Sequence, residues 1–249
     1  MAAYPSIAAL DAELIECRAC PRLVAWREQV AREKRAAFAD QEYWGRPVPG
    51  FGDEHARMMI LGLAPAAHGA NRTGRMFTGD QSGDVLFKAL YDVGLASRPT
   101  AVSADDGMEL YGVRMTAPVR CAPPQNKPTP AERDRCATWL EAELALLAPT
   151  LRSVLVLGAF GWRSALTGFA SMGWTVDRPR PKFGHGARTT IRRPRADDGT
   201  GASSTAAEEL TVFGSYHVSQ HNTFTGRLTP EMLRAVIRDA AGAAGLSTD

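Results

Sequence analysis

The sequence predicts an α/β fold, a three-layer α/β/α sandwich around a mostly parallel central sheet. Continuous apolar runs such as Met58 to Leu63 and Ser153 to Leu157 are typical of strands buried on both faces. Stretches with helical periodicity separate these runs, so strand and helix alternate along the chain. Such alternation favours a mostly parallel sheet that is covered by helices on both faces.

Each predicted element has its own signal. The strands are the apolar runs, expected at residues 58–63, 113–119, 153–157 and 210–213. Helices are expected at residues 8–38 and 82–93, from Thr129 onward, directly after residue 157, and at 232–241. The third helix has the clearest start, because Thr129 can cap it, Pro130 fits its first turn and Glu132 lies near its positive end.

The composition is that of a globular protein. The 249 residues carry a formal charge of +2, with 45% hydrophobic and 22% charged residues, which excludes a disordered or fibrous chain. The length suits one domain, which we expect to span residues 1–249, with a mobile low-complexity loop at 195–208. No apolar run approaches the roughly 18 residues of a membrane helix. The N-terminus does not resemble a signal peptide, so a cytoplasmic location is expected.

Three loops are candidates for the functional site, because ligands of parallel sheets bind beyond the carboxyl ends of the strands. They are residues 64–80, 120–130 and 214–228. The first is rich in glycine but matches neither a dinucleotide-binding motif nor a P-loop, so no nucleotide cofactor is implied. A loop of this length usually lines a site.

Several side chains in these loops could carry chemistry. In the first loop the polar candidates are His68, Asn71 and Asp80, and Phe77 offers a surface on which a ring could stack. Asp80 could equally be the N-cap of the helix that follows, and the two roles are compatible. In the last loop, His217 could polarise a substrate oxygen, although a lone histidine is more often structural.

A strip of positive charge covers residues 178–195. It holds seven basic residues and no acidic one, namely Arg178, Arg180, Lys182, Arg188, Arg192, Arg193 and Arg195. With Pro and Gly between the charges, the strip does not read as an ordinary helix face. On an otherwise neutral protein this pattern indicates contact with nucleic-acid phosphates, with Arg192 and Arg193 as the first candidates.

The four cysteines are Cys17, Cys20, Cys121 and Cys136. The first two form a C-x2-C turn, and the other two follow a hundred residues later with fourteen residues between them. A zinc ribbon would have a second C-x2-C turn nearby, so this spacing fits a 4Fe–4S cluster better than zinc. The alternative is four unrelated buried thiols.

Taken together, three stretches resemble the uracil-DNA glycosylase superfamily, and most closely its family 5, the type B enzymes. They are Gly-Leu-Ala-Pro with Gly-Arg-Met-Phe-Thr-Gly-Asp (62–65 and 74–80), Arg-Cys-Ala-Pro-Pro-Gln-Asn-Lys-Pro-Thr (120–129) and His-Val-Ser-Gln-His-Asn-Thr (217–223). The resemblance extends from Cys17 to the last helix. It implies a 4Fe–4S cluster on the four cysteines and a monofunctional hydrolase of base-excision repair that removes uracil from DNA.

The resemblance also implies roles for single residues. Phe77 matches the residue that stacks on the flipped base, and His217 matches the histidine that donates to uracil O2. Gly62, Ala64 and Ala66 are expected to line the base pocket, and Asn222 to contact DNA. The partner is then double-stranded or single-stranded DNA with a damaged base, bound by a monomer.

Two positions depart from other families of the superfamily. Ala66 stands where those families place an Asp or Asn that positions the attacking water, and a methyl group cannot do this. Asp80 is the nearest carboxylate in the same loop and becomes the first candidate for the catalytic role. Ala117 stands where others have the Asn that reads uracil, which leaves Asn126 as the amide of the facing loop. A pocket that lacks this uracil-recognising Asn should also accept deaminated purines such as hypoxanthine.

Two alternatives of other classes remain. One is a non-catalytic iron–sulfur protein that binds nucleic acid through its arginine strip, an interpretation that Ala66 keeps open. The other is a redox protein that carries a cluster. Release of free base from a uracil-containing oligonucleotide would separate the first alternative from an enzyme.

Overall fold

The structure, a computed structural model, describes residues 4–194 and 209–248. Within these residues one six-stranded sheet has the order β1-β3-β2-β4-β6-β5. Its strands are β1 (Phe51–Gly52), β2 (Met58–Leu61), β3 (Val113–Thr116), β4 (Ser153–Leu157), β5 (Arg188–Arg192) and β6 (Glu209–Ser215). The four inner strands run parallel, and β1 and β5 pair antiparallel at the two edges. The predicted α/β class with a mostly parallel sheet is confirmed.

Eight α-helices and two short 3-10 helices accompany the sheet in the described residues. They are α1 (Ile7–Leu14), α2 (Pro21–Glu33), η1 (Ala36–Phe38), α3 (Ala70–Thr73), α4 (Gln81–Asp92), η2 (Pro124–Asn126), α5 (Pro130–Leu147), α6 (Ala159–Ser171), α7 (Gln220–Phe224) and α8 (Pro230–Ala243). Across the two described ranges, none of these helices is long and apolar enough to cross a membrane.

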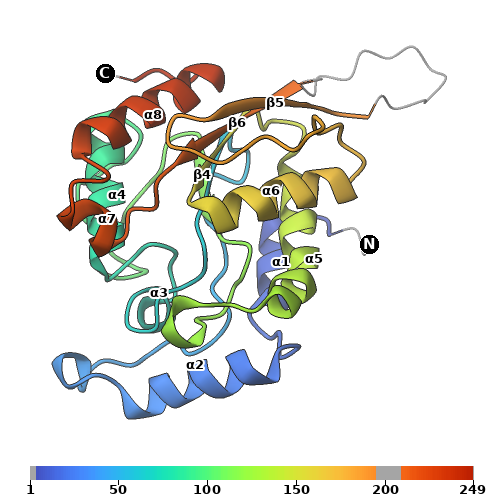
Figure 1. Cartoon of the computed structure of the whole chain (residues 1–249). Coiled ribbons are helices and arrows are strands. Elements are labelled where there is room, and N and C mark those ends of the chain that lie inside the picture. Colours follow the sequence, from blue (N-terminus) through green and yellow to red (C-terminus); the bar gives the residue numbers. More distant parts are fainter. Residues whose placement is uncertain (1–3, 195–208, 249) are drawn as a thin grey trace.

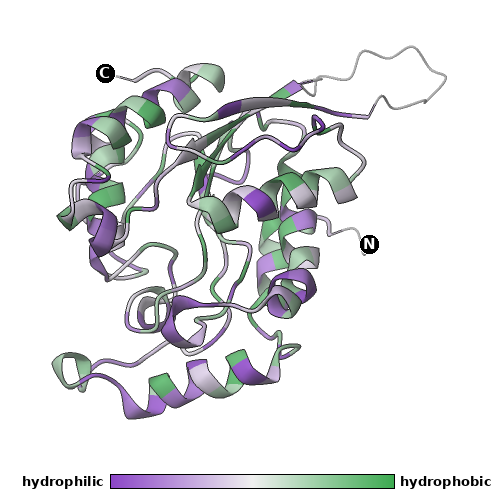
Figure 2. Cartoon of the chain, viewed as in Figure 1, coloured by the Kyte–Doolittle hydropathy of each residue, from purple (hydrophilic) through white to green (hydrophobic). Residues whose placement is uncertain are grey.

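Successive side chains of a strand point to opposite faces of the sheet, so each face has its own apolar core and its own layer of helices. On β2, Met58 and Ile60 pack into one apolar core, while Met59 and Leu61 pack into another on the opposite face. The first core includes residues of α4 and α8, and the second includes residues of α5 and α6 (Figure 1). The inner strands β2 and β4 are largely apolar, whereas the edge strand β5 and the outward faces of the helices carry polar residues (Figure 2). These are the three layers that the sequence predicts.

The N-terminal helix is shorter than predicted. The sequence favours one helix over residues 8–38, but the structure has α1 and α2 separated by residues 15–20. Cys20 is extended, with φ −114° and ψ 92°, and Pro21 occupies the first turn of α2. A proline there has no N–H to donate to the preceding turn and disfavours helical backbone at the residue before it. The C-x2-C turn therefore interrupts the helical pattern.

The arginine strip contains a strand that the prediction omits. β5 has the burial pattern of an edge strand, with Thr189 and Ile191 buried and Arg188 and Arg192 exposed. β1 is likewise absent from the predicted strands, whereas β2, β3, β4 and β6 overlap the predicted apolar runs. α5 begins after Thr129, the predicted N-cap, and the structure adds a reciprocal capping box with Glu132. The predicted mobile loop at 195–208 lies outside the described residues.

Candidate active site

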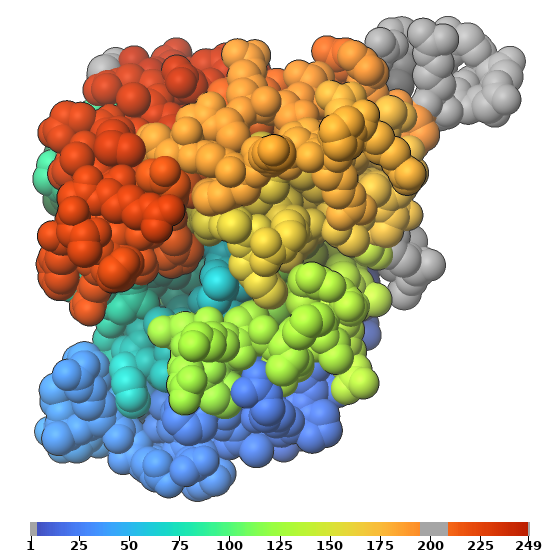
Figure 3. Space-filling view, viewed as in Figure 1, coloured from blue at the N-terminus to red at the C-terminus, as the bar shows by residue number. Residues whose placement is uncertain are grey.

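The three candidate loops meet at one edge of the sheet, as predicted. They are residues 64–80 after β2, residues 120–130 beyond β3, and residues 214–228, which begin at the end of β6. At this edge the Gly62 N–H donates to the Thr116 carbonyl (2.9 Å), and the Gly158 N–H donates to the Ser215 carbonyl (2.8 Å). The molecular surface is hollowed where the red-orange, yellow and green segments meet, with cyan at its base (Figure 3).

Phe77 is fixed against the backbone of Gly62. A Cβ atom at Gly62 would lie only 2.6 Å from Phe77 Cζ, so the ring can approach only because residue 62 is glycine. Phe77 has φ +54°, a left-handed conformation that is unfavourable for a bulky residue. Gly83 makes room for this backbone, because any Cβ at Gly83 would overlap the Phe77 carbonyl oxygen at 1.7 Å. Such strain often marks a functional position.

Asp80 is the N-cap of α4, which confirms the structural half of its prediction. Its Oδ1 accepts the Gly83 N–H at 3.0 Å. Oδ2 faces Gly69, where a Cβ would approach it to 2.2 Å. Burial raises the pKa of the Asp80 carboxyl, although the amides of Gly83 and Ser82 act in the opposite direction. The geometry is compatible with the catalytic role, which stays a prediction.

Asn71 and His68, the other polar candidates of the first loop, hydrogen-bond to other parts of the protein. Asn71 is fully buried, and its amide lies 3.3 Å from the Arg27 carbonyl in α2. His68 shares a hydrogen bond with the Tyr43 hydroxyl at 3.0 Å. Both side chains therefore have structural partners. Ala66 offers only a half-buried methyl group, and its carbonyl accepts the Asn71 N–H.

His217 is enclosed at the end of β6. Burial lowers the pKa of its imidazole to about 4, so the ring is neutral at pH 7. Gly158 faces it, since a Cβ there would lie 3.5 Å from His217 Cβ. The Asn222 amide donates to the His217 carbonyl at 2.8 Å, which anchors the loop. That contact gives Asn222 a structural role, and its contact with DNA stays a prediction.

His185 also belongs to this edge, and the sequence did not point to it. Its Nδ1 lies 3.4 Å from the Tyr216 N–H and 3.3 Å from the Ser215 hydroxyl. Because Nδ1 accepts from that N–H, the proton of the neutral ring is on Nε2, which is a donor. Burial lowers the pKa of this imidazole as well. The only sequence signal is a histidine between two glycines inside the arginine strip.

Two further residues lie exposed near this edge. Phe224, at the end of α7, has 72% of its surface exposed, an unusual state for phenylalanine that was not predicted from the sequence. Asn126 is exposed on η2 with φ +56°, after Gln125 with φ +55°. Asparagine tolerates this conformation better than most residues.

The arginine strip runs from the candidate site to the opposite end of β6. Arg188 pairs in register with Phe213, near the end of β6 that carries Ser215. Arg192 pairs with Glu209 at the start of β6, and the two side chains form an exposed ion pair (3.0 Å). The Arg193 guanidinium lies over the Trp174 ring at 5.3 Å. The two first candidates for DNA contact are therefore the strip residues farther from His217.

The four cysteines line one small cavity between α2, the start of loop 120–130 and α5. Its other lining residues are Leu14, Ala19, Leu23, Val24, Pro47, Arg120, Arg135 and Trp139. Burial raises the pKa of the Cys121 thiol to about 11 and that of Cys136 to about 12. Residues from both halves of the C-x2-C and C-x14-C pattern thus meet, which unrelated thiols would not do.

Cationic groups around this cavity have unused hydrogen-bond donors. Arg27 Nη1 lies 2.9 Å from Cys121 Sγ, and its buried Nε has no partner in the described part of the chain. Arg120 donates to Glu143, but its Nε and Nη1 are buried and likewise unpartnered there. Burial alone would raise the pKa of Glu143, yet Arg120 and Arg114 lower it to about 2. Donors and positive charge of this kind suit a buried anionic group.

The arrangement of the thiols can be compared with what a single metal ion and a cluster would each require. In the described residues no three His, Cys, Asp or Glu side chains converge as ligands of one ion, whereas zinc requires thiolates within about 2.3 Å of the metal. Four thiols that line a common cavity, with arginine donors around them, fit the larger 4Fe–4S group.

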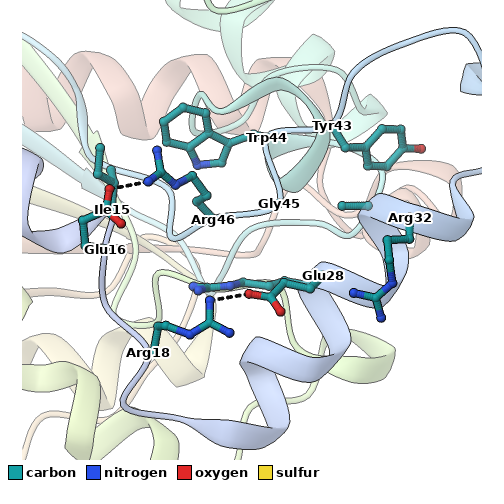
Figure 4. A pocket seen from close by; sticks show the side chains of 11 residues that line it. Ile15, Glu16, Arg18, Glu28, Arg32, Tyr43, Trp44, Gly45 and Arg46 are labelled. Atoms are coloured by element: carbon teal, nitrogen blue, oxygen red, sulfur yellow. Dashed lines mark hydrogen bonds and ion pairs between the residues drawn. The ribbon is translucent and has the colours of Figure 1, made fainter.

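A larger pocket of about 390 Å³ lies on the other side of Arg27, between α2 and residues 43–46 (Figure 4). Its charged residues are largely neutralised. Arg18 pairs with Glu28 and Arg46 pairs with Glu16. A pocket whose charges are already paired has little to offer an anionic ligand, so the sheet edge remains the candidate active site.

Comparison with known proteins agrees with this assignment. The sequence profile of the Uracil DNA glycosylase superfamily matches residues 49–241. The chain is 53% identical to the type-5 uracil-DNA glycosylase of Mycobacterium tuberculosis, over 97% of this chain and 83% of that protein. It is 48% identical to the type-5 enzyme of Thermus thermophilus, over 94% of this chain and 96% of that protein.

A more distant relative is the type-4 uracil-DNA glycosylase of Archaeoglobus fulgidus, 28% identical over 54% of this chain and 60% of that protein. The profile match covers most of the chain, including all three candidate loops. The chain therefore belongs to the uracil-DNA glycosylase superfamily, and within it to the type-5 uracil-DNA glycosylases.

Proposed function

We propose that this protein removes uracil from DNA by hydrolysing the N-glycosidic bond, as the first step of base-excision repair. One observation carries the proposal furthest: an aromatic ring packed against Gly62, that of Phe77, and a neutral, half-buried imidazole, that of His217, occur in loops at the same edge of the sheet. The names of the type-5 relatives support the same substrate. The reaction adds water across the bond and leaves a free base and an abasic deoxyribose.

The target nucleotide must leave the base stack before the bond can be reached, at a cost of roughly a few kcal/mol. Phe77 is proposed to receive the flipped base by stacking. Its ring already packs against the backbone of Gly62, so little side-chain entropy is lost when the base binds. Gly62, Ala64 and Ala66 would then line the pocket with small groups.

His217 is proposed to donate a hydrogen bond to uracil O2, where negative charge develops as the base departs. A neutral ring suits this task, because it donates without first having to lose or gain a proton at pH 7. An oriented donor of this type contributes roughly 3–4 kcal/mol to transition-state stabilisation. The Asn222 amide holds the backbone of His217 in place.

Asp80 is proposed to stabilise the positive charge that develops on the sugar, or to hold the attacking water. Ala66 has no group that can do either. Asp80 is held by the Gly83 N–H on one oxygen and lies against Gly69 with the other. A carboxylate in a poorly hydrated site interacts strongly with a nearby cation.

The cavity formed by Cys17, Cys20, Cys121 and Cys136 is proposed to hold a 4Fe–4S cluster. When bound, the cluster would supply a cross-link between α2 and α5 rather than take part in the reaction. Arg27 and Arg120 would provide hydrogen bonds and positive charge toward it. Iron and acid-labile sulfide analysis of protein purified without air tests this, and zinc, or no metal, would contradict it.

The finer substrate range follows from the base pocket. Ala117 and the exposed Asn126 leave no buried amide in this facing segment to read uracil strictly, so hypoxanthine is proposed as a further substrate. Double-stranded and single-stranded DNA are the proposed partners, bound by a monomer in the cytoplasm, with Arg192, Arg193 and Asn222 as predicted contacts.

A panel of oligonucleotides, each with one damaged base, tests the proposal directly. Release of free uracil is expected, together with release of hypoxanthine. Binding of every oligonucleotide without release of any base would instead support a non-catalytic nucleic-acid-binding protein. The same panel run on single-stranded and duplex DNA measures the preference between the two.

A further inference from the structure

A second concave surface lies beside the candidate active site. It is a hollow of about 320 Å³ between the start of α6 and residues 180–183. Its apolar lining consists of Ala159, Trp162, Leu166, Pro181 and Phe183, and its charged lining consists of Arg163, Arg180 and Lys182. No carboxylate is among the residues that line it. The hollow thus combines an apolar floor with a rim of one charge sign.

The rim charges are not neutralised by the protein. Within residues 4–194 and 209–248, none of Arg163, Arg180 and Lys182 forms an ion pair with an acidic residue, and Arg180 donates only to the Thr167 hydroxyl (3.0 Å). In the pocket of Figure 4, by contrast, Arg18 and Arg46 are paired with glutamates that line the same pocket, although Arg32 forms no ion pair in the described residues. The hollow therefore presents three cations without an acidic partner beside an apolar surface.

The position of the hollow connects it to the reaction proposed above. Ala159 directly follows Gly158, the residue that faces His217. On the other side, the Phe183 and Tyr216 rings lie 6.5 Å apart, and Tyr216 precedes His217 in the chain. The hollow also contains the first turn of the 13-residue helix α6, whose positive end favours anions.

We propose that this hollow is a subsite for the DNA strand on one side of the target nucleotide, an inference that rests on the proposed function. The phosphates pair with Arg163 and Lys182, and the neighbouring deoxyribose or base lies on the apolar floor. A nucleic-acid strand presents phosphates and apolar rings in alternation, which matches this lining. A free phosphate would use the cations and leave the floor empty.

The test replaces Arg163 and Lys182 together with glutamine. Both side chains are exposed, so the fold should be kept. Arg238→Gln is the matched control, because Arg238 is an exposed arginine on α8 with no ion pair in the described chain. Binding of a uracil-free single-stranded oligonucleotide is measured by fluorescence anisotropy over a range of salt concentrations.

We expect the double variant to bind at least about tenfold more weakly at low salt, with a salt slope smaller by about 1.4, since each single-strand phosphate contributes about 0.7. The Arg238→Gln protein should match the wild type. An unchanged slope in the double variant, or an equal loss in the control, would overturn the subsite.

A second ligand distinguishes a DNA subsite from an unspecific cation patch. A poly-glutamate peptide of matched charge should bind weakly to the wild type and be insensitive to the double substitution; equal sensitivity would show an unspecific patch and overturn the proposal. The oligonucleotide contains no uracil, so the result does not depend on catalysis. If the wild type bound this DNA with the expected slope but released no uracil from a uracil-containing strand, only the proposed function would fail.

Discussion

The cysteine cavity and the active-site edge are both buried and both contain titratable groups, yet they are built in opposite ways. In the cavity, burial raises the pKa of Cys121 and Cys136, Arg27 Nη1 lies on Cys121 Sγ, and Arg27 and Arg120 keep buried donors without a partner in the described residues. At the edge, burial alone lowers the pKa of His217, without a contribution from a charged neighbour. In the cavity burial by itself keeps the thiols neutral, so a lasting negative charge there would depend on the arginine donors, whereas at the edge burial keeps the imidazole neutral.

This difference matches the two tasks that are proposed. A resident anionic group needs lasting compensation, because an uncompensated buried charge is costly. A departing base carries negative charge only in the transition state, so a neutral donor that is already oriented stabilises that state selectively. The two regions also touch, because the Arg27 side chain lies on Cys121 while its carbonyl faces Asn71 of the first loop.

The largest effect should follow from removing one thiol of the cavity. Cys136→Ser is expected to abolish iron binding and leave the arginine donors without their anion. We expect a loss of several kcal/mol, which lowers the melting temperature by roughly 10 °C or more for a chain of this size. Iron analysis and thermal denaturation measure both effects. A variant with full iron content and an unchanged melting temperature would contradict the proposed role.

Removing the His217 imidazole, the proposed neutral hydrogen-bond donor, should affect catalysis rather than folding. His217→Ala is expected to slow uracil release by roughly 10²–10³-fold, because one hydrogen bond to the developing oxyanion is lost. Purines should be affected less if the contact with O2 is specific. His221→Ala is the matched control, since this exposed histidine lies four residues further along. Equal rates for both variants and the wild type would exclude the donor role.

A substitution at Asp80 distinguishes its role as the N-cap of α4 from its proposed catalytic role. Asp80→Asn keeps the size and the capping oxygen, so the stability should barely change. The rate of base release should fall by roughly 10²-fold if the charge matters. Asp84→Asn, in the first turn of the same helix, controls for the loss of a carboxylate. A folded Asp80→Asn protein with the wild-type rate would reduce Asp80 to a cap.

The smallest effect concerns pH. His217 has a pKa of about 4 against an ordinary value of 6.5, so it titrates below the neutral range. Uracil release should therefore show no inflection near 6.5. Between about 4 and 6.5 the unfolded chain binds the additional proton, so this group lowers the stability as the pH falls through that window. An inflection near 6.5 that disappears in His217→Ala would refute the neutral-donor interpretation.

The parts of the fold that depend on burial could be predicted from the sequence. Ser153–Leu157 is an almost wholly apolar run and forms β4 with the predicted bounds, and Thr129 is the predicted N-cap of α5. The break before Pro21 was missed because apolar spacing continues across it. β5 was missed because arginines stand at both of its ends, and the alternation of buried and exposed residues between them is too short to be recognised.

The sequence predicts which loops form the candidate site, but it predicts less well where their side chains point. Parallel strands bring the three loops together whatever their detailed path. The direction of each side chain depends on local turns, so Asn71 faces α2 although Asp80, in the same loop, faces Gly69. His185 lies at the edge only because β5 runs antiparallel to β6, which the sequence did not reveal.

The spacing of the cysteines also sets an order of events during synthesis. Cys17 and Cys20 leave the ribosome early, whereas Cys136 follows more than a hundred residues later. At about 5–20 residues per second, the first two thiols wait for several seconds or longer before the cavity can close around them. Any delivery of iron and sulfide to the complete set of thiols is therefore confined to chains of which more than half has been translated.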